Sequence, residues 1–190
     1  CQLVHLTKNG EPVKMSKRAG NFVTVRDVLD EVGKDILRFV MLMRKTNQDM
    51  EFDLDKVKEQ SRDNPVFYVQ YAYARINSVS KQLADRGFTF DPDLGLSELA
   101  LLTEAEEQGL LDTLARYPSM ITNAAVNYEP HLLTHYLRDL ASDFHRYYNA
   151  HHFLVDDVKM RNARLALVMA TKQVLLNGFE LLGIGAPETM

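Results

Sequence analysis

The sequence predicts a mainly α-helical protein in which a bundle of long helices follows a small head that contains β-structure. Two observations predict this class. Beyond residue 60, apolar residues recur every three or four positions over long segments, as they do in amphipathic helices. In the head, residues 3–7 alternate apolar and polar and then meet the turn signal Lys8-Asn9-Gly10-Glu11, so a hairpin with residues 12–15 as its return limb is expected.

Two helices are expected to follow the hairpin. Thr24 predicts the N-terminus of the first, because Asp27 follows it three residues later. Gly33 ends that helix, and Asp35 is expected to cap a second one over residues 36–44. The second segment is apolar on nearly all sides, which indicates burial in a larger body. The expected buried residues of the first helix are Val28, Leu29 and Val32.

Two helices are expected to open the bundle. Pro65 lies in the first turn of a helix that runs to about residue 83. Thr103 and Glu106 form a capping box for the next helix, which ends before Pro118. The core stripe of the first of these helices is Val69, Ala72, Ile76, Val79 and Leu83. The stretches between the expected helices are residues 45–53 and 86–95.

Two further helices are expected to complete it. One begins at Pro130 and carries apolar residues at alternating spacings of four and three. Asp156 or Asp157 caps the longest helix, which reaches Leu182 and is ended by Gly183. The core residues of the helix that starts at Pro130 are Leu133, Leu137, Leu140, Phe144 and Tyr147.

The composition narrows the class of protein. A net charge of −4 and a pI near 5.9 argue against binding nucleic acid by bulk positive charge, so any RNA contact must be local. No apolar run approaches the roughly 20 residues of a membrane span, so no membrane contact is expected. Cys1 is the sole cysteine, which fits a reducing cytoplasm, and we expect it to be a cut point or a processed end.

The loop Lys14-Met15-Ser16-Lys17-Arg18 is the sharpest chemical signal. It places two lysines and a serine before a flexible Ala19-Gly20-Asn21 exit. Mobile ammonium groups and a hydroxyl suit a polyphosphate whose charge shifts during reaction. A solvated basic turn has the same composition, so the residues alone leave both interpretations open.

A resemblance to a known family adds to this pattern. The loop resembles the ATP-phosphate loop of class I aminoacyl-tRNA synthetases, and the sequence after it, through Gly33-Lys34-Asp35-Ile36, is typical of arginyl-tRNA synthetases. The resemblance implies that Lys17 is the main catalytic phosphate contact and that Lys14 assists it. It also implies an ATP-binding loop made of Lys14, Met15, Ser16, Lys17 and Arg18. ATP with Mg²⁺ is then a substrate of the full enzyme, and no tightly bound cofactor is expected in this chain.

The segment Asn64-Pro65-Val66-Phe67-Tyr68-Val69-Gln70-Tyr71-Ala72-Tyr73-Ala74-Arg75 resembles the first helix of that family's anticodon-binding domain. Tyr68, Tyr71 and Arg75 share one helical face, roughly 100° from the core stripe. Aromatic rings interleaved with a guanidinium can stack unpaired RNA bases. The alternative is that these tyrosines pack between helices with their hydroxyls in water.

Later segments resemble the same domain. By resemblance, Tyr148, His152 and the terminal Met190 lie around the anticodon bases, and the chain ending at Met190 suggests a true C-terminus. On the last helix, Arg164 and Lys172 are expected to contact tRNA, while Arg161 shares a face with Lys172 that suits either a phosphate track or solvent. Thr189 departs from the family, since relatives usually have arginine there. His145, His151 and His152 are the candidate metal ligands, but no metal site is expected because no cysteines lie near them.

The resemblance implies two domains: residues 1–60 as the end of a catalytic domain and residues 61–190 as a helical anticodon-binding domain. The expected function is the C-terminal part of an arginine–tRNA ligase, with arginine tRNA as partner, ATP and arginine as ligands of the full enzyme, and a monomeric chain. No His-x-Gly-His motif is present, so the chain alone is expected to be inactive. A stand-alone tRNA-binding module without catalysis is the alternative, and a different class I synthetase is a weaker one.

Overall fold

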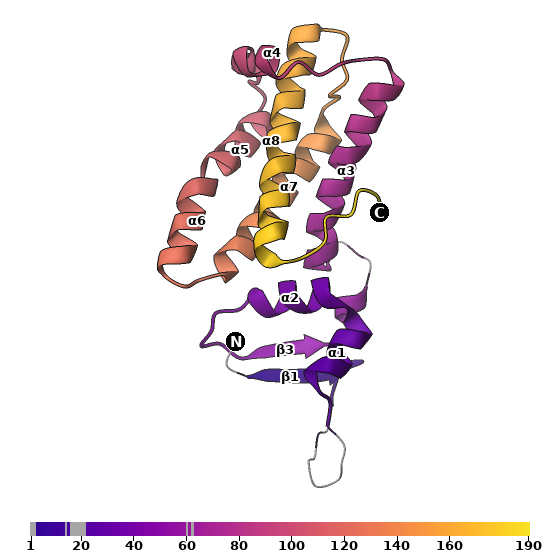
Figure 1. Ribbon diagram of the computed structural model, residues 1–190, viewed down its shortest axis with the longest axis vertical. Coiled ribbons are helices and arrows are strands. Elements are labelled where there is room, and N and C mark those ends of the chain that lie inside the picture. Colours follow the sequence, from indigo (N-terminus) through magenta and orange to yellow (C-terminus); the bar gives the residue numbers. More distant parts are fainter. Residues whose placement is uncertain (1–2, 14, 16–21, 60, 62) are drawn as a thin grey trace.

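The computed structural model describes residues 3–13, 15, 22–59, 61 and 63–190. A small sheet with two short helices forms one end of the molecule, and a helical bundle forms the other (Figure 1). The mainly α-helical class predicted from the sequence is confirmed.

The sheet of the head has three strands in the order β2-β1-β3. β1 (Val4–Lys8) and β2 (Glu11–Pro12) form the predicted hairpin. Asn9 and Gly10 both have positive φ, 52° and 76°, as a two-residue hairpin turn of the favoured hand requires. β3 (Met50–Asp53) pairs with β1 in parallel, although the sequence predicts only a connector between helices over residues 45–53.

Two helices cover the sheet. α1 (Val25–Val32) starts at Thr24, whose hydroxyl accepts a hydrogen bond from the Asp27 amide at 3.1 Å while Asp27 accepts one from the Thr24 amide at 2.8 Å. The predicted capping box is therefore confirmed. The prediction that Asp35 caps the next helix is wrong: α2 (Lys34–Leu42) starts from Gly33 at φ 83°, and Asp35 lies in its first turn.

The bundle contains α3 (Pro65–Asp85), α4 (Pro92–Ser97), α5 (Ala105–Ala115), α6 (Tyr117–Val126), α7 (His131–Ala150) and α8 (Val158–Leu182). Two 3₁₀ turns, Lys56–Lys58 and Leu99–Leu101, precede α3 and α5. All residues of the two predicted core stripes, on α3 and α7, are buried. Asp157 caps α8, whose end at Leu182 is also as predicted.

Three details of the bundle correct the predictions. α4 was missed, although Asp91 caps it and its Gly95 packs tightly against α8: a Cβ there would lie 2.6 Å from the Asn162 carbonyl oxygen. α6 was missed because Pro118 was interpreted as a terminator, whereas proline is well tolerated in a first turn. The capping box of α5 is formed by Glu104 and Glu107, one residue after the predicted pair.

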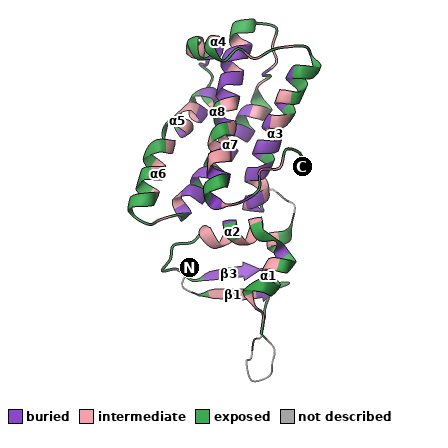
Figure 2. Ribbon diagram, viewed as in Figure 1, coloured by how far each residue is buried: buried purple, intermediate pink, exposed green. Residues whose placement is uncertain are grey.

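Apolar side chains gather in two clusters, and the buried residues line the inner faces of the bundle helices (Figure 2). The large cluster fills the bundle and includes Phe39 of α2. The small cluster lies within the head, where α1 meets β3, and consists of Val28, Val32, Met50, Phe52 and Leu54. Ile36 and Val40 contact both clusters, which explains why α2 is apolar on nearly all sides.

α8 is long and apolar enough, by length and composition, to cross a membrane, and no other helix of the described residues passes that test. α8 packs against α3, α4, α5 and α7, and half of its apolar window is buried in the bundle. Its place as the central core helix accounts for its composition.

Candidate nucleic-acid interface

The start of α3 sets the face that this helix presents to α7. The Asn64 side chain accepts hydrogen bonds from the amides of Val66 and Phe67, and Pro65 occupies the first turn. With the helix phase fixed there, the core stripe of α3 points into the bundle. Tyr68, Tyr71 and Arg75 lie on the neighbouring face, with Tyr71 39% exposed.

Arg75 lies between two tyrosine rings. Its Cζ is 4.5 Å from the ring centroid of Tyr71 on α3 and 4.6 Å from that of Tyr148 on α7. Its Nη1 donates to Asn149 Oδ1 at 3.4 Å. A planar cation stacked between two rings holds both of them in fixed orientations. The structure thus brings together three predicted site residues that are up to 77 positions apart in the sequence.

His145 supports the same face and was considered only as a metal ligand from the sequence. Its ring centroid lies 4.7 Å from that of Tyr68 and 5.6 Å from that of Tyr71. Its Nε2 is 3.2 Å from the Tyr68 carbonyl oxygen, and its Nδ1 is 3.3 Å from Arg75 Nη1. His145 precedes Tyr148 by three positions on a helix, and this spacing was the available signal that it faces α3.

Three adjoining hollows run along the contact of α3 with α7, and we call them the α3–α7 groove. The first, of about 210 Å³, is lined by Tyr68, Tyr71, Arg75, Ser142, His145, Arg146 and Asn149. The second, of about 350 Å³, is lined by Val79, Gln82, Arg86, Tyr148, His151, His152, Phe153 and Leu154. The third, of about 570 Å³, is lined by Pro65, Tyr68, His135, Arg138, Asp139 and Ser142.

Shared or contacting residues connect the first hollow to the other two. Tyr68 and Ser142 line both the first and the third. Tyr148 lines the second, and its ring stacks on Arg75 of the first. The groove therefore offers aromatic faces, amide groups and cationic groups in one line. Unpaired nucleotides with stacked bases need this combination of groups.

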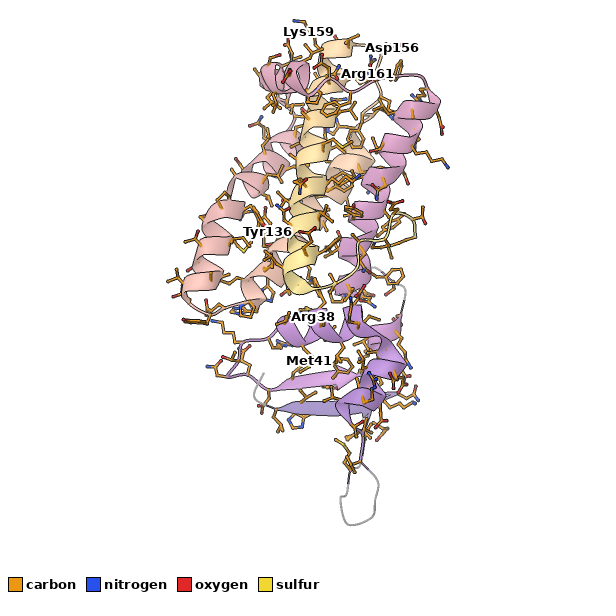
Figure 3. The ribbon with its side chains drawn as sticks, viewed as in Figure 1. Arg38, Met41, Tyr136, Asp156, Lys159 and Arg161 are labelled. Carbon is orange, nitrogen blue, oxygen red and sulfur yellow. The ribbon has the colours of Figure 1, made fainter. Side chains whose placement is uncertain are left out.

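Residues 151–157 form the loop between α7 and α8, which carries His152 at the edge of the groove. Three arginines donate to carbonyl oxygens of this loop. Arg164 Nη1 bonds to His152 O at 2.8 Å, Arg86 Nη1 to Leu154 O at 3.4 Å, and Arg161 Nη1 to Val155 O at 2.7 Å. In Figure 3, Arg161 lies near Asp156 at the end of the bundle where this loop runs. These bonds hold the loop to α3 and α8.

Two adjacent glutamates at the start of α5 complete this support. Glu107 is fully buried and accepts from Arg164 Nε at 2.9 Å, which leaves the Arg164 side chain 12% exposed. Glu106 Oε2 lies 3.1 Å from His151 Nε2, and this hydrogen bond lowers the pKa of Glu106. His151 is thereby turned inward, while its neighbour His152 remains exposed.

The cations of α8 are arranged differently from the prediction. Arg161 is buried and stacks on the Phe88 ring at 4.0 Å, so the idea that it lies on an exposed phosphate track is wrong. Lys172 is half-buried, with its Nζ 5.6 Å from the Tyr73 ring centroid. Lys172 lines none of the three hollows of the groove. The structure does not bring it together with the Tyr71–Arg75–Tyr148 stack.

The remaining predicted site residues lie at the two ends of the described chain. Met190 is 48% exposed, and the chain end lies beside α3 in the view of Figure 1. Met15 is exposed and lines an apolar hollow of about 280 Å³ with Val23, Leu37 and other residues of the head. The other four residues of the predicted ATP-binding loop lie outside the described residues: Lys14, Ser16, Lys17 and Arg18.

The three histidines that were considered as metal ligands do not gather. His145 packs against tyrosines, His151 bonds to Glu106, and His152 lines the groove. Within the part of the chain that the structure describes, no three His, Cys, Asp or Glu side chains are placed to hold a metal ion.

Two family models match the chain. The model of the DALR anticodon binding domain matches residues 69–190, which contain all of α7 and α8 and most of α3. The model of the tRNA synthetases class I (I, L, M and V) matches residues 3–53, which contain the sheet and both helices of the head.

Arginine–tRNA ligases are similar to the chain over its whole length. The protein of Thioalkalivibrio sulfidiphilus is 52% identical and that of Coxiella burnetii 50% identical over 189 residues, 100% of this chain and 32% of each relative. The solved arginyl-tRNA synthetase of Thermus thermophilus has a TM-score of 0.76 at 28% identity, over 99% of this chain and 34% of that one. The chain thus spans about a third of the length of these relatives. Since the DALR model covers more than half of it, the chain belongs to the family of DALR anticodon binding domains.

Proposed function

We propose that this chain is the tRNA-recognition part of an arginine–tRNA ligase and binds arginine tRNA through the α3–α7 groove. The observation that carries the proposal is the stack of Arg75 between Tyr71 and Tyr148, at the border of two hollows. The rings are held in place before any ligand arrives, so little side-chain entropy is lost when a base stacks on them. Similarity to arginine–tRNA ligases along the whole chain supports arginine tRNA as the partner.

Each predicted contact has a place in this proposal. Tyr68, Tyr71 and Tyr148 supply stacking surfaces, and Arg75 supplies a cation. His152 and Met190 extend the face at its two ends. Lys172 serves as a phosphate contact outside the groove. Arg164 acts on RNA only indirectly, through its bond to the carbonyl oxygen of His152.

The head of the chain belongs, in this proposal, to the catalytic part of the whole enzyme. Lys14 and Lys17 stabilise the phosphates of ATP–Mg²⁺ during activation of arginine, and Met15, Ser16 and Arg18 complete the loop. The small apolar cluster of the head supports a division near residue 60 into domains 1–60 and 61–190, with α2 packed on both clusters. We expect a monomer in the cytoplasm, and we expect the 190-residue chain to be inactive in arginine-dependent pyrophosphate exchange.

The test is a titration of the chain with arginine tRNA and with the same tRNA carrying a swapped anticodon, at one fixed salt concentration. We expect weak binding that is at least fivefold tighter for arginine tRNA. Equal affinity for the two RNAs would show that this chain does not recognise the anticodon. Selective binding without exchange activity also fits a stand-alone tRNA-binding module, so the loop needs its own experiment.

That experiment uses the full-length parent enzyme. Lys17→Ala should lower the rate of arginine activation at least about tenfold, since each 1.4 kcal/mol of lost transition-state stabilisation is a factor of ten. Lys8→Ala is the matched control, because Lys8 is a half-exposed lysine of the same head that pairs with Glu31. A rate within twofold of wild type for Lys17→Ala would remove this residue from catalysis.

A further inference from the structure

α2 contributes a side chain to the C-terminal end of α8. The amides of Gly183 and Ile184 bond back to the carbonyl oxygens of Glu180 and Phe179, which satisfies two of the final acceptors of the helix. The Leu182 carbonyl oxygen accepts instead from Arg38 Nε of α2, at 2.6 Å. Figure 3 shows Arg38 at the junction of head and bundle, near the end of α8. A cation at a helix C-terminus is favoured by the helix dipole.

One turn earlier on α2, Asp35 holds the segment that follows α8. Asp35 Oδ2 accepts from the Gly185 amide at 3.0 Å and from Gln70 Nε2 at 3.1 Å. Gln70 Nε2 also donates to the Gly185 carbonyl oxygen at 2.9 Å. Gln70 is buried on α3, directly before Tyr71. Both polar groups of the Gly185 backbone are therefore bonded, one to α2 and one to α3.

Two glycines leave room for this arrangement. Gly183 has φ 65°, and a Cβ there would lie 3.0 Å from the Arg38 guanidinium. A Cβ on Gly185 would lie 2.9 Å from Asp35 Oδ2. A Cβ at either position would force the Arg38 or Asp35 side chain to shift, and the positive φ of Gly183 also favours glycine there.

We propose that Asp35 and Arg38 are positioning residues for RNA recognition, which fix residues 183–190 against α3. The inference rests on the proposed function, because these residues end in Met190. Through Gln70, the same contacts reach the turn of α3 that carries Tyr71. The head thereby orders one end of the RNA-binding face, although neither Asp35 nor Arg38 lines the groove.

The first measurement needs no RNA. Asp35→Ala removes the acceptor of the Gly185 amide, so hydrogen exchange at this amide should become about tenfold faster. Asp35→Asn keeps an oxygen acceptor without the charge and should give an intermediate rate. Asp30→Ala on α1 is the matched control, because Asp30 pairs only with Arg26 among the described residues. Unchanged exchange at Gly185 in Asp35→Ala would overturn the proposal.

The second measurement links these contacts to RNA. Asp35→Ala should weaken binding of arginine tRNA by the chain about fivefold, and Met190→Ala by a similar factor. In the double variant the two losses should not multiply, because both act through the position of the same segment. Multiplied losses, or wild-type affinity in Asp35→Ala, would overturn the positioning role. Wild-type chain that does not distinguish the two tRNAs would instead overturn the proposed function, and the RNA role of these contacts with it.

Discussion

Arginines and aromatic rings meet in two regions of the molecule, with different results. In the α3–α7 groove, Arg75 lies between two tyrosine rings beside open hollows. At the other side of the loop over residues 151–157, Arg161 stacks on Phe88 and Arg164 pairs with buried Glu107. Both of these arginines also donate to backbone carbonyl oxygens of the loop, Arg161 to Val155 and Arg164 to His152. Residue type alone therefore does not tell an arginine that borders open hollows from one that is bonded to the loop; the partners that the fold supplies do.

The largest expected effect is a loss of stability when the buried pair of Glu107 and Arg164 is broken. Glu107→Ala leaves the Arg164 guanidinium without its carboxylate partner, in a place where 12% of that side chain reaches solvent. Loss of one member of a buried pair costs about 3–5 kcal/mol in free energy of unfolding. Urea unfolding of wild type and Glu107→Ala at pH 7 measures this loss of unfolding free energy. Glu106→Ala is the control, since Glu106 is 39% exposed and its loss should lower the free energy of unfolding far less. Similar losses in both variants would contradict the distinction.

Buried tyrosines should make stability depend on pH above 10. Burial raises the pKa of Tyr136 and Tyr147 above the usual value of about 10. As pH rises past 10 the unfolded state loses these protons while the folded state keeps them. The stabilisation is complete below pH 10 and falls above it by about 1.4 kcal/mol per pH unit for each tyrosine.

Tyr136→Phe should remove one such contribution from the slope of unfolding free energy between pH 10 and 11. The control is Tyr128→Phe, because Tyr128 is 86% exposed. A hydrogen-bonded carboxylate raises the pKa of Lys58 and of Lys159, but both lysines are common to the two variants. An unchanged slope in Tyr136→Phe would show that this ring ionises in the folded state.

On the groove side, Tyr71→Ala should weaken binding of arginine tRNA about fivefold or more. Base–aromatic stacking is worth roughly 1–3 kcal/mol per base, whereas the exposed ring contributes little to folding. Tyr148→Ala should weaken the binding of arginine tRNA by a similar factor. Tyr128→Ala is the control, because Tyr128 is an exposed tyrosine outside the groove. If Tyr71→Ala lowers the unfolding free energy as much as a core substitution and leaves RNA affinity intact, the groove is a packing interface only.

The smallest effect concerns Lys172. If its ammonium contacts a phosphate, Lys172→Ala should weaken the binding of arginine tRNA and of anticodon-swapped tRNA by the same factor. It should also lower the slope of log affinity against log salt by about 1. Lys81→Ala is the control, because Lys81 is exposed on α3. A slope equal to wild type would confine Lys172 to its contact with the Tyr73 ring.

The long helices were predictable because their apolar residues repeat with the period of the helix. The core stripes of α3 and α7, Pro65 in the first turn of α3 and the cap at Asp157 all follow from local sequence. β3 and α4 were not predictable in this way. β3 is four residues long and is fixed by pairing with β1, more than forty positions earlier. α4 is held by close packing of Gly95 on α8, a contact that periodicity cannot show.

The candidate site also contains residues that local sequence predicts and residues that it does not. Helical spacing placed Tyr68, Tyr71 and Arg75 on one face, and the structure adds Tyr148 from α7. The roles of His145, Arg161 and Arg164 depend on partners from other elements, so their residue types alone gave no guide. The sequence gives no sign that Glu107, which accepts a hydrogen bond from Arg164, is buried, because it stands among other acidic residues in one segment.

The central place of α8 has a consequence for synthesis of the protein. α8 is the last bundle helix in the sequence, yet it packs against α3, α4, α5 and α7. The roughly 120 residues from the start of α3 to the end of α8 take about 6–24 s to translate at 5–20 residues per second. Until α8 has emerged, the faces of α3, α4, α5 and α7 that pack on it remain uncovered. The nascent chain thus exposes apolar surface on the ribosome, in the interval when chaperones bind such surfaces.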